Sequence, residues 1–568
     1  MPNKEVKWVL KDTPDDIEGA QGGLPAILLK LLAQRGVLGD EPVQNFLKPK
    51  LRDLSDPFLL PDMEKAVDRI LQAVDNGENV LVYGDYDVDG VSSVTLMLTT
   101  LEQYGMQAEY FIPKRGEEGY GLSDASIESM LSNGKKVDLI ITVDCGTASI
   151  DEVKLLSEKG VDVIIVDHHE PNVRGLPDCV AVVNPKLGDD FHYLCAAGVV
   201  FKLAHALMKR RRIDGFDLRD YIDLVAVATI SDIVPLVDEN RLLVRHGLAR
   251  LPTTKNIGLK TLQEIAQMKG PFTSMDVGFR IGPRLNAAGR MDQPEEALNL
   301  LMSQDAAEAK KLAQKLDDFN TERQQHERRI REEATDMLEQ KFDAENDTVL
   351  VLGSRDWHPG VVGIVASRLM RKYHKPTFVI SIDDEGLGKG SGRSVEGVSL
   401  VGAIQHCTEL LEAGGGHEMA AGLSVQESNL DAFRDKFSQY VLDTTTEDER
   451  APRMYVDAEI DFSELSLDFL DSYELLHPFG SKNPQPVFMS RNVWLTEAPR
   501  RLKNSHLKLF MRQNMVEHDA IFFGGGERDL PDPPWDVAFT IDRNTFRGMT
   551  SLQVVIQDIR KAKELSAE

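Results

Sequence analysis

Between residues 78 and 185, short apolar segments alternate with helical patterns, and this alternation constrains the fold more than any other feature of the chain. A repeated strand–helix–strand succession predicts an α/β domain with a parallel sheet and helices on its faces. Binding and reacting residues lie at the carboxyl ends of the strands in such sheets. The expected strands are the segments 79–85, 108–113, 137–144, 161–169 and 180–185.

Three of these expected strands end in aspartate or histidine. Asp85 and Asp87 follow the first strand, Asp144 ends the third, and His168 and His169 end the fourth. Because the carboxyl ends of neighbouring parallel strands are close in space, we expect these side chains to converge on one edge. A helix N-cap explains any one aspartate, but it requires neither an Asp-x-Asp pair nor two histidines. The convergence predicts a site for hard divalent cations.

The segment 82–90 reads VYGDYDVDG and places Asp85, Asp87 and Asp89 at alternate positions. In extended backbone, alternate side chains share one face. A calcium loop of the EF-hand type is rejected, because its twelfth position would be Leu96 rather than an acid. A solvated acidic turn and a phosphatase with an aspartyl nucleophile stay open on this segment alone.

Two later segments supply further candidates. Asp232 follows an apolar helical pattern, where it either ends the helix or returns a fourth acidic ligand to the same edge. In the segment 275–295, a Gly-rich turn is expected to present Arg280, Arg284, Asn286 and Arg290. Guanidinium groups on such a loop suit phosphate oxygens, and pairing with nearby acids is the alternative.

The residues after this turn predict a long helix and a second α/β unit. The segment 304–342 is charged, without Pro or Gly, and is expected to be a mostly solvated spacer helix. In the second unit, 346–440, the glycine-rich segments 388–394 and 414–422 are interpreted as loops. Their backbone N–H groups, with Arg393 and His417, suit a phosphate, although each segment alone is more often an ordinary turn.

From 453 to 562 the hydrophobic pattern has period two, which predicts a small five-stranded β-barrel. Basic groups and aromatic rings in this part suit single-stranded nucleic acid, and a plain barrel core with a solvated charged hairpin is the alternative. The residues in question are Arg500, Arg501, Lys503, His506, Lys508, Arg512, Phe510 and Phe522.

Residues 1–60 are expected to be an N-terminal appendage to the first domain.

Composition restricts the class of protein. The formal net charge of -27 argues against a nucleic-acid binder, but a small basic strip on an acidic body suffices to bind phosphates. The four cysteines form no CxxC pair, which favours neither a zinc site nor disulfides. The chain begins without the apolar core of a signal peptide and has no run long enough to span a membrane, so we expect a cytoplasmic protein.

These motifs together resemble the DHH phosphoesterase family. The matching segments are GDYDVDG (84–90), VDCG (143–146), VDHHE (166–170), SDIVPL (231–236), GPRLNAAGR (282–290), KGSGRS (389–394) and GGGHEMAAG (414–422). The resemblance implies a DHH domain at 61–300, a spacer helix at 301–343, a DHH-associated domain at 344–443 and an oligonucleotide-binding (OB-like) barrel at 453–564.

The resemblance also implies residue roles. Two ions, Mn²⁺ or Mg²⁺, would be held by Asp85, Asp87, Asp144, His168 and Asp232, with Asp144 bridging. His169 would support the ligands or protonate the leaving oxygen. Some members have a histidine where this chain has Tyr83. Arg115, Ser391 and Arg393 would hold a 5′ phosphate, and Arg284 and His417 would line the path of the strand.

The function implied is that of a single-stranded-DNA-specific exonuclease of DNA repair and recombination, which degrades from the 5′ end and releases mononucleotides. Its implied partners are single-stranded DNA, single-strand-binding protein and a RecQ-type helicase. Two alternatives are a phosphodiesterase for short oligonucleotides or cyclic dinucleotides, and a replication scaffold on a decayed fold. The scaffold is disfavoured because all five ligand positions are present.

Overall fold

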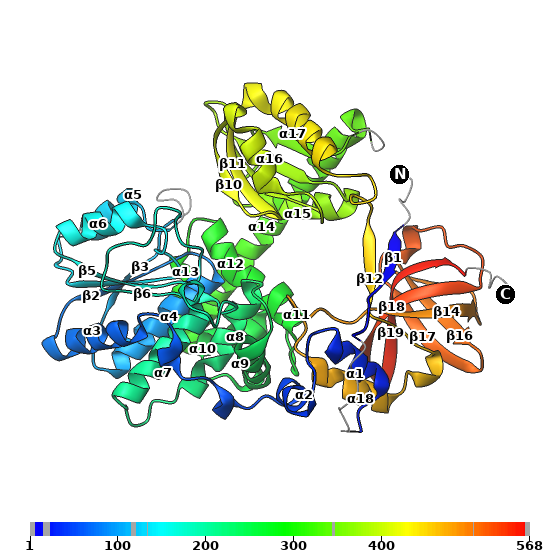
Figure 1. Cartoon of the computed structure of the whole chain (residues 1–568), viewed down its shortest axis with the longest axis horizontal. Helices are drawn as coiled ribbons and strands as arrows, with labels where there is room; N and C mark the ends of the chain where they lie inside the picture. The colour runs from blue at the N-terminus through cyan, green and yellow to red at the C-terminus, as the bar shows by residue number, and fades with distance from the viewer. Residues whose placement is uncertain are drawn as a thin grey trace.

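The structure is a computed structural model that describes residues 6–14, 23–114, 121–132, 134–343, 347–503 and 505–562. Three lobes are visible in Figure 1: an α/β lobe with many helices, a smaller α/β lobe above it, and a β-barrel lobe at the side. No helix in the described ranges is long and apolar enough to cross a membrane.

The first lobe is built on five strands, β2 (Val80–Gly84), β3 (Glu109–Phe111), β4 (Leu139–Val143), β5 (Asp162–Val166) and β6 (Ala181–Val183). They form a parallel sheet in the order β3-β2-β4-β5-β6, which confirms the predicted α/β sheet. Helices cover both faces, as the continuous apolar strands require. Along β2, Val80 and Val82 pack into one core, and Leu81 and Tyr83 into the other.

The covering helices differ between the two faces. The Val82 face packs on α3 (Met63–Asn76), α4 (Val88–Gln103) and α7 (Ala196–Arg210). The Tyr83 face packs on α5 (Asp124–Leu131) and α6 (Ile150–Glu158). The lobe continues with α8 (Ile222–Ser231), α9 (Asp238–Arg250), α10 (Ile257–Ile265), α11 (Ser274–Asp276), a π-helical turn (Val277–Ile281), α12 (Gly282–Arg290) and α13 (Glu295–Met302).

The segment expected to be a Gly-rich turn is therefore helical, and that prediction is wrong. Its glycines permit close packing rather than a turn. A Cβ added to Gly282 would lie 2.7 Å from Oγ of Ser231, and one added to Gly289 would lie 2.5 Å from the carbonyl oxygen of Tyr86. The helix α12 thus lies directly against the segment that follows β2.

The spacer helix α14 (Ala306–Lys341) is present, but it is less solvated than expected. One stripe along it is buried. Ala309, Ala313 and Leu316 pack into the first lobe, whereas Ile330, Ala334 and Leu338 pack into the second. Between these apolar ends the buried residues are polar: Asn320, Arg323 and Glu327.

The second lobe has a mixed sheet in the order β10-β11-β9-β8-β7. Its elements are β7 (Leu350–Ser354), α15 (Val362–Tyr373), β8 (Thr377–Ile382), β9 (Leu387–Arg393), α16 (Leu400–His406), β10 (Leu411–Gly416), β11 (Ala420–Gln426) and α17 (Leu430–Thr444). The segment 388–394, expected to be a loop, is mostly strand β9 in the middle of the sheet. Its glycines make room for the core: a Cβ on Gly392 would lie 2.4 Å from the ring of Phe378.

The third lobe is a barrel of seven strands rather than the five expected. Their order is β13-β14-β18-β19-β17-β16-β15, and a further pairing joins β14 to β16. The strands are β13 (Ala458–Glu459), β14 (Phe488–Leu495), β15 (Arg500–Leu502), β16 (His506–Gln513), β17 (Val516–Phe522), β18 (Trp535–Phe546) and β19 (Met549–Lys561). The helix α18 (Leu467–Tyr473) belongs to this lobe.

The N-terminal segment joins the barrel lobe, so the prediction that residues 1–60 attach to the first domain is wrong for most of their described part. Strand β1 (Lys7–Leu10) pairs in parallel with β12 (Arg453–Val456) and lies beside the barrel in Figure 1. The helices α1 (Ala26–Ala33) and α2 (Asp40–Leu47) contribute apolar side chains to the barrel core. Apolar side chains from Leu51 onward pack into the core of the first lobe, and α2 contacts that lobe through the carbonyl oxygen of Phe46, which accepts from Nε of Arg241 at 3.0 Å.

Candidate metal centre and nucleic-acid interface

The acidic motif after β2 lies where the strand turns into α4. Asp85 is buried, with 1% of its surface exposed. Asp87 is the N-cap of α4, and its Oδ1 accepts hydrogen bonds from the backbone N–H groups of Asp89 (2.8 Å) and Gly90 (3.1 Å). A capping carboxylate is favoured at a helix N-terminus. Both of these bonds go to Oδ1, so Asp87 can cap the helix with one oxygen and bind a cation with Oδ2.

Asp144 follows β4 in an unusual backbone conformation. Its φ of +63° lies in the left-handed region, which costs free energy for a residue with a side chain. The side chain is buried, and its Oδ1 lies 3.3 Å from Nε2 of His168, which follows β5. The strained backbone aims the carboxylate across the strand ends, as the sequence predicted for neighbouring parallel strands.

Asp89 was not among the predicted ligands, yet it lies at the same edge. It is buried on the first turn of α4, where Oδ2 accepts from the N–H of Ala196 (2.7 Å) and Oδ1 from that of Ala197 (2.9 Å). Its Oδ2 is 3.8 Å from Nε2 of His168. The alternate spacing of the three aspartates was a signal for this residue. The helix starting at Val88 changes which side chains share a face.

Asp232 reaches the same place from the helical part of the lobe. It is the C-cap of α8, and its Oδ2 lies 3.7 Å from Nε2 of His168. Within the described chain, Oδ2 of Asp232 and Oδ1 of Asp144 are buried and have no hydrogen-bond partner. Buried oxygens without donors are costly, and a cation relieves that cost.

The electrostatics of this edge favour a bound cation. Burial and the surrounding carboxylates raise the pKa of Asp144 well above its ordinary value. Burial, with Asp89 and Asp87, raises the pKa of Asp232 to about 8. Burial lowers the pKa of His168, which favours the neutral imidazole that binds metals. Like charges in a low dielectric repel strongly, so the ionised site requires positive charge.

His169 differs from His168 in its partner. Its Nδ1 lies 2.7 Å from Oδ1 of the buried Asp167. Although burial alone would lower it, this hydrogen bond to Asp167 raises the pKa of His169 to about 9. Asp167 also accepts from the N–H of Thr147 (3.0 Å), which fixes the carboxylate. A protonated His169 beside the candidate ligands is a proton donor held in position.

The described residues form three groups whose ligand atoms lie within 4.8 Å of one another. Asp144 belongs to two of them and His168 to two. Carboxylates and imidazoles fit Mn²⁺ or Mg²⁺, so these residues suit two neighbouring ions. The groups are Asp85, Asp87 and Asp144; Asp89, His168 and Asp232; and Asp144, His168 and His169.

Tyr83 contributes no ligand. Its ring is fully buried and stacks on Phe111 with ring centroids 5.6 Å apart, and its hydroxyl donates to the carbonyl oxygen of Gly121 at 2.8 Å. The side chain thus points to the face opposite the α4 core. Where some family members have a histidine, this chain thus has a side chain that packs in the core.

The predicted phosphate-binding residues lie in different settings. Ser391 and Arg393 are on β9, where Nη1 of Arg393 donates to Oγ of Ser391 at 3.1 Å. Of the segment 414–422, expected to be a loop, only residues 417–419 lie between β10 and β11, and His417 is exposed there. Arg284 instead donates through Nε to Asp317 of α14 at 2.8 Å, so the alternative of pairing with an acid holds for this residue. Arg115 lies outside the described residues.

A row of contacts connects β9 to the metal edge, the name used here for the ends of β2, β4 and β5 that carry Asp85, Asp144 and His168. The amide oxygen of Asn286 on α12 accepts from the N–H of Val88 at 3.2 Å. Nη1 of Arg290, at the end of α12, donates to the carbonyl oxygen of Gly360 at 2.8 Å. On the adjoining helix α15, a Cβ on Gly363 would lie 2.8 Å from Oγ of Ser391. The second lobe therefore faces the metal edge through this row.

The barrel presents a mixed basic and aromatic outer face. Trp494 is 48% exposed, and the guanidinium of Arg500 lies 4.6 Å from the ring centre of Phe510. Arg512 pairs with Trp494 across the strands. Phe522, expected among the stacking rings, is buried in the barrel core.

Comparisons with known proteins agree with this architecture. Residues 79–229 match the DHH family, N-terminal domain, residues 346–443 the DHHA1 domain, and residues 456–558 the RecJ OB domain. The single-stranded-DNA-specific exonuclease RecJ of Bacillus subtilis is 37% identical over 94% of this chain and 67% of its own length. RecJ of Haemophilus influenzae is 35% identical over 90% of this chain and 93% of its own length.

This chain belongs to the RecJ family. The RecJ of Thermus thermophilus in complex with Mn²⁺ superposes with a TM-score of 0.85 at 30% identity, covering 100% of this chain and 81% of that one. Its complex with Mg²⁺ gives 0.79 at 29% identity, covering 99% and 79%. The order of DHH domain, DHHA1 domain and barrel that the sequence predicted is thus the RecJ order.

Proposed function

We propose that this chain is a metal-dependent exonuclease that hydrolyses single-stranded DNA from the 5′ end and releases mononucleotides. The observation that supports this most is the convergence of Asp89, Asp144, His168 and Asp232 on one sheet edge. Among the described residues, the buried Oδ1 of Asp144 and Oδ2 of Asp232 have no hydrogen-bond donor. Membership of the RecJ family supports the substrate and the reaction.

The chain's residues have distinct tasks in this proposal. Asp85, Asp87, Asp89, Asp144, His168 and Asp232 would hold two Mn²⁺ or Mg²⁺ ions, and Asp144 belongs to two of the three ligand groups. Bound there, the ions supply a water nucleophile and stabilise charge on the attacked phosphate. His169, kept protonated by Asp167, is placed to give its proton to the leaving oxygen.

Recognition of the end would come from the second lobe. Ser391 and Arg393 lie side by side on β9, and the contacts through Asn286, Arg290 and Gly360 join this strand to the metal edge. A guanidinium and a hydroxyl suit the oxygens of a terminal phosphate. With Arg115, they would stop the strand one nucleotide beyond the metals, which explains cleavage from an end.

Digestion of end-labelled strands tests the proposal. Single strands labelled at the 5′ or the 3′ end, and the matching duplex, are incubated with Mn²⁺, Mg²⁺ or EDTA. We expect labelled mononucleotides at once from the 5′-labelled single strand, shortening ladders from the 3′-labelled one, and no product in EDTA. The Asp144→Asn protein from the same purification excludes a contaminating nuclease. Internal cutting, or equal cutting of the duplex, would contradict the proposal.

Protein partners form the finer part of the proposal. Contact with single-strand-binding protein and with a RecQ-type helicase follows from the family resemblance, and a location in the cytoplasm agrees with it. Pull-down of each purified partner by this chain, at about physiological salt, is the direct measurement.

A further inference from the structure

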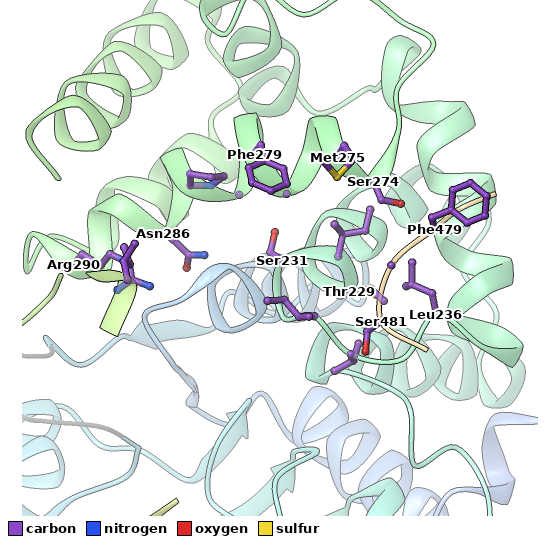
Figure 2. Close-up of a pocket in the computed structure, with 18 of the residues that line it drawn as sticks. Thr229, Ser231, Leu236, Ser274, Met275, Phe279, Asn286, Arg290, Phe479 and Ser481 are labelled. Atoms are coloured by element: carbon purple, nitrogen blue, oxygen red, sulfur yellow. The ribbon is translucent and has the colours of Figure 1, made fainter. Parts of the chain in front are cut away.

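Two hollows lie at opposite ends of the helix α8. The hollow at its end is lined by Thr229 and Ser231 of α8 and by Asn286 and Arg290 of α12 (Figure 2). It lies next to the candidate ligand Asp232, the residue after Ser231, and is part of the site already described. The hollow at the start of α8 has a volume of about 270 Å³ and lies apart from that site. We call it the α8 cavity.

Four parts of the first lobe enclose the α8 cavity. Its wall comes from α4, from the turn Leu218–Tyr221 with the first residues of α8, from the start of α10, and from the end of α13. The buried lining residues are Thr95, Asp223, Leu224, Leu301 and Ser303, and the exposed ones are Glu102, Gln103, Lys255 and Gln304. The cavity therefore reaches from the surface into the lobe.

Asp223 is the only charged residue at the buried end, among the described residues that line the cavity. It is 1% exposed. Oδ1 accepts from the N–H of Leu224 at 2.8 Å, whereas Oδ2 is buried and has no hydrogen-bond partner in the described chain. Although Arg250 lies near enough to lower the pKa of Asp223, its Nη2 donates to Asp220. A buried carboxylate oxygen without a donor is costly unless a ligand supplies the donor.

The hydroxyl groups at the buried end also lack a donor. The hydroxyl of Thr95 donates to the carbonyl oxygen of Val91 at 2.7 Å, and that of Ser303 donates to the carbonyl oxygen of Asp305 at 3.1 Å. A hydroxyl has one proton to donate, so each of these oxygens keeps lone pairs for a donor from elsewhere. A ligand that fits this end must bring hydrogen-bond donors and positive charge.

A second carboxylate lies at the mouth of the cavity. Glu102, near the end of α4, is exposed, and none of the described residues forms an ion pair with it. The third acid of the lining, Asp220, is already paired with Lys255 at 2.7 Å. Leu224 and Leu301 give the wall apolar surface. An acidic buried end, an apolar wall and an acidic mouth suit an aliphatic chain with a cation at each end.

We propose that the α8 cavity binds a short aliphatic diamine, with one ammonium group on Asp223 and the other on Glu102. A primary ammonium group has three donors and no acceptor, which corresponds to Oδ2 of Asp223 and the two hydroxyl oxygens. The alkyl chain contacts Leu224 and Leu301. Asp223 lies about 14 Å along α8 from Asp232, so the diamine does not touch the metal edge. The inference is independent of the proposed exonuclease function.

A ligand held in this way joins α4 to α8. These two helices present candidate metal ligands at their other ends, Asp89 on the first turn of α4 and Asp232 at the C-cap of α8. A diamine between Glu102 and Asp223 therefore stabilises the arrangement that positions both ligands. Because it binds only the folded chain, it also raises the stability of the folded protein.

Binding of 1,4-diaminobutane to the whole chain tests the proposal. Isothermal titration and the Tm at increasing diamine concentration are measured at constant ionic strength, without DNA. Saturating Mg²⁺ keeps the carboxylates of the metal edge from binding the amine. The formal net charge of -27 attracts any dication diffusely, so saturation at one diamine per chain is the result expected of a site. We expect the Tm to rise with the diamine and not with butane-1,4-diol, which has the same length and no charge.

Variants locate the binding. Asp223→Asn should weaken binding of 1,4-diaminobutane about tenfold to a hundredfold, the effect of one charge-assisted contact, and remove most of the rise in Tm. Asp214→Asn is the matched control, because it removes the same charge from an exposed position outside the cavity, and it should change neither quantity. In Glu102→Gln, 1,4-diaminobutane should lose its advantage over butylamine, since the second ammonium group no longer meets a carboxylate.

The outcomes are distinct. No saturable binding by wild type, or equal affinity of wild type and folded Asp223→Asn for the diamine, overturns the inference. It is also overturned if KCl in place of NaCl gives the same stabilisation and competes with the diamine, because the cavity is then a site for a monovalent metal ion. If Asp223→Asn does not fold, the exposed Glu102→Gln decides: an unchanged ratio of the two amine affinities overturns the inference. None of these results bears on the exonuclease function.

Discussion

Oδ2 of Asp89 lies 3.8 Å from Nε2 of His168, although Asp89 belongs to a helix and His168 to the end of a strand. The position of the carboxylate is set from a third element, because the N–H groups of Ala196 and Ala197 on α7 both donate to it. Three elements thus fix one side chain at the metal edge.

We predict that Asp89→Asn reduces hydrolysis and Mn²⁺ affinity at least about 10- to 100-fold, the loss typical even of residues that only support ligands. An amide offers one oxygen and one NH₂ group, so one backbone N–H of α7 loses its acceptor and the site loses a charge. Isothermal titration with Mn²⁺ and single-strand digestion measure both effects. Asp162→Asn, at the other end of β5 from His168, is the control. Wild-type Mn²⁺ affinity in Asp89→Asn would remove it from the ligand set.

Arg393→Ala should reduce the preference for strands with a 5′ phosphate over strands with a 5′ hydroxyl. A lost charge-assisted contact costs about 1.5–3 kcal/mol, which corresponds to roughly tenfold or more in the rate ratio. The measurement is the ratio of kcat/KM for the two kinds of end. Arg371→Ala removes an exposed cation from α15 of the same lobe and should leave the ratio unchanged. Arg115→Ala is predicted to act like Arg393→Ala; if neither variant changes the ratio, the end is recognised elsewhere.

Trp494→Ala should weaken binding of long single strands and spare cleavage of short oligonucleotides. Trp494 is exposed on the outer face of the barrel beside Arg512, and a stacked base contributes about 1–3 kcal/mol. Anisotropy of labelled long and short strands at one salt concentration distinguishes the two effects. Met549→Ala, also exposed on the barrel, is the control. Equal weakening of both strand lengths would argue against a barrel role specific to long strands.

Deletion of the barrel, residues 453–568, should likewise weaken binding of long single strands and spare cleavage of short oligonucleotides. Leu28, Leu31 and Val43 of the N-terminal helices pack into the barrel core. Deleting the barrel alone would leave these apolar side chains exposed to water, which destabilises the remaining protein. Residues 1–47 must therefore be removed together with 453–568 before cleavage of short oligonucleotides is measured. Wild-type affinity of that truncated protein for long strands would contradict the barrel's role.

Acid should destabilise the junction between barrel and first lobe through His477. Burial lowers the pKa of His477 to about 4, whereas an unfolded histidine has a pKa of about 6.5. Between pH 6.5 and pH 4, His477 binds a proton in the unfolded chain but not in the folded one. The free energy of unfolding therefore falls as the pH falls. His477→Gln should lessen this fall, by at most about 1.4 kcal/mol per pH unit. Urea unfolding at several pH values, with the exposed His192→Gln as control, measures it. Parallel curves for wild type and His477→Gln would refute the assignment.

Much of the active edge could be predicted from local pattern. The apolar strands and their polar ends are local features, and parallel pairing brings such ends together whatever the rest of the chain does. Asp144 and His168, which follow two of these strands, were therefore predicted to lie at one edge, and they do; for Asp232 the sequence left a helix end and a fourth ligand open, and the structure has it as the C-cap of α8 at the same edge. Asp89 was missed as a candidate ligand because its direction depends on where α4 begins, and a helix start at Val88 is set by the cap at Asp87.

The sequence by itself determined the α/β sheet, the period-two barrel and the convergence of acids, because these follow from periodicity within short segments. Only the tertiary structure decided what the glycines do and which distant segments pair. From the sequence, Gly392 and Gly289 were expected to lie in a loop or a turn. In the structure, a Cβ on Gly392 would clash with the ring of Phe378, and one on Gly289 with the carbonyl oxygen of Tyr86, so both glycines permit close packing. Strand β1 pairs with β12 across more than four hundred residues, a contact that no local pattern encodes. Arg284 likewise needed Asp317 on α14, because a guanidinium binds whichever anion the fold brings to it.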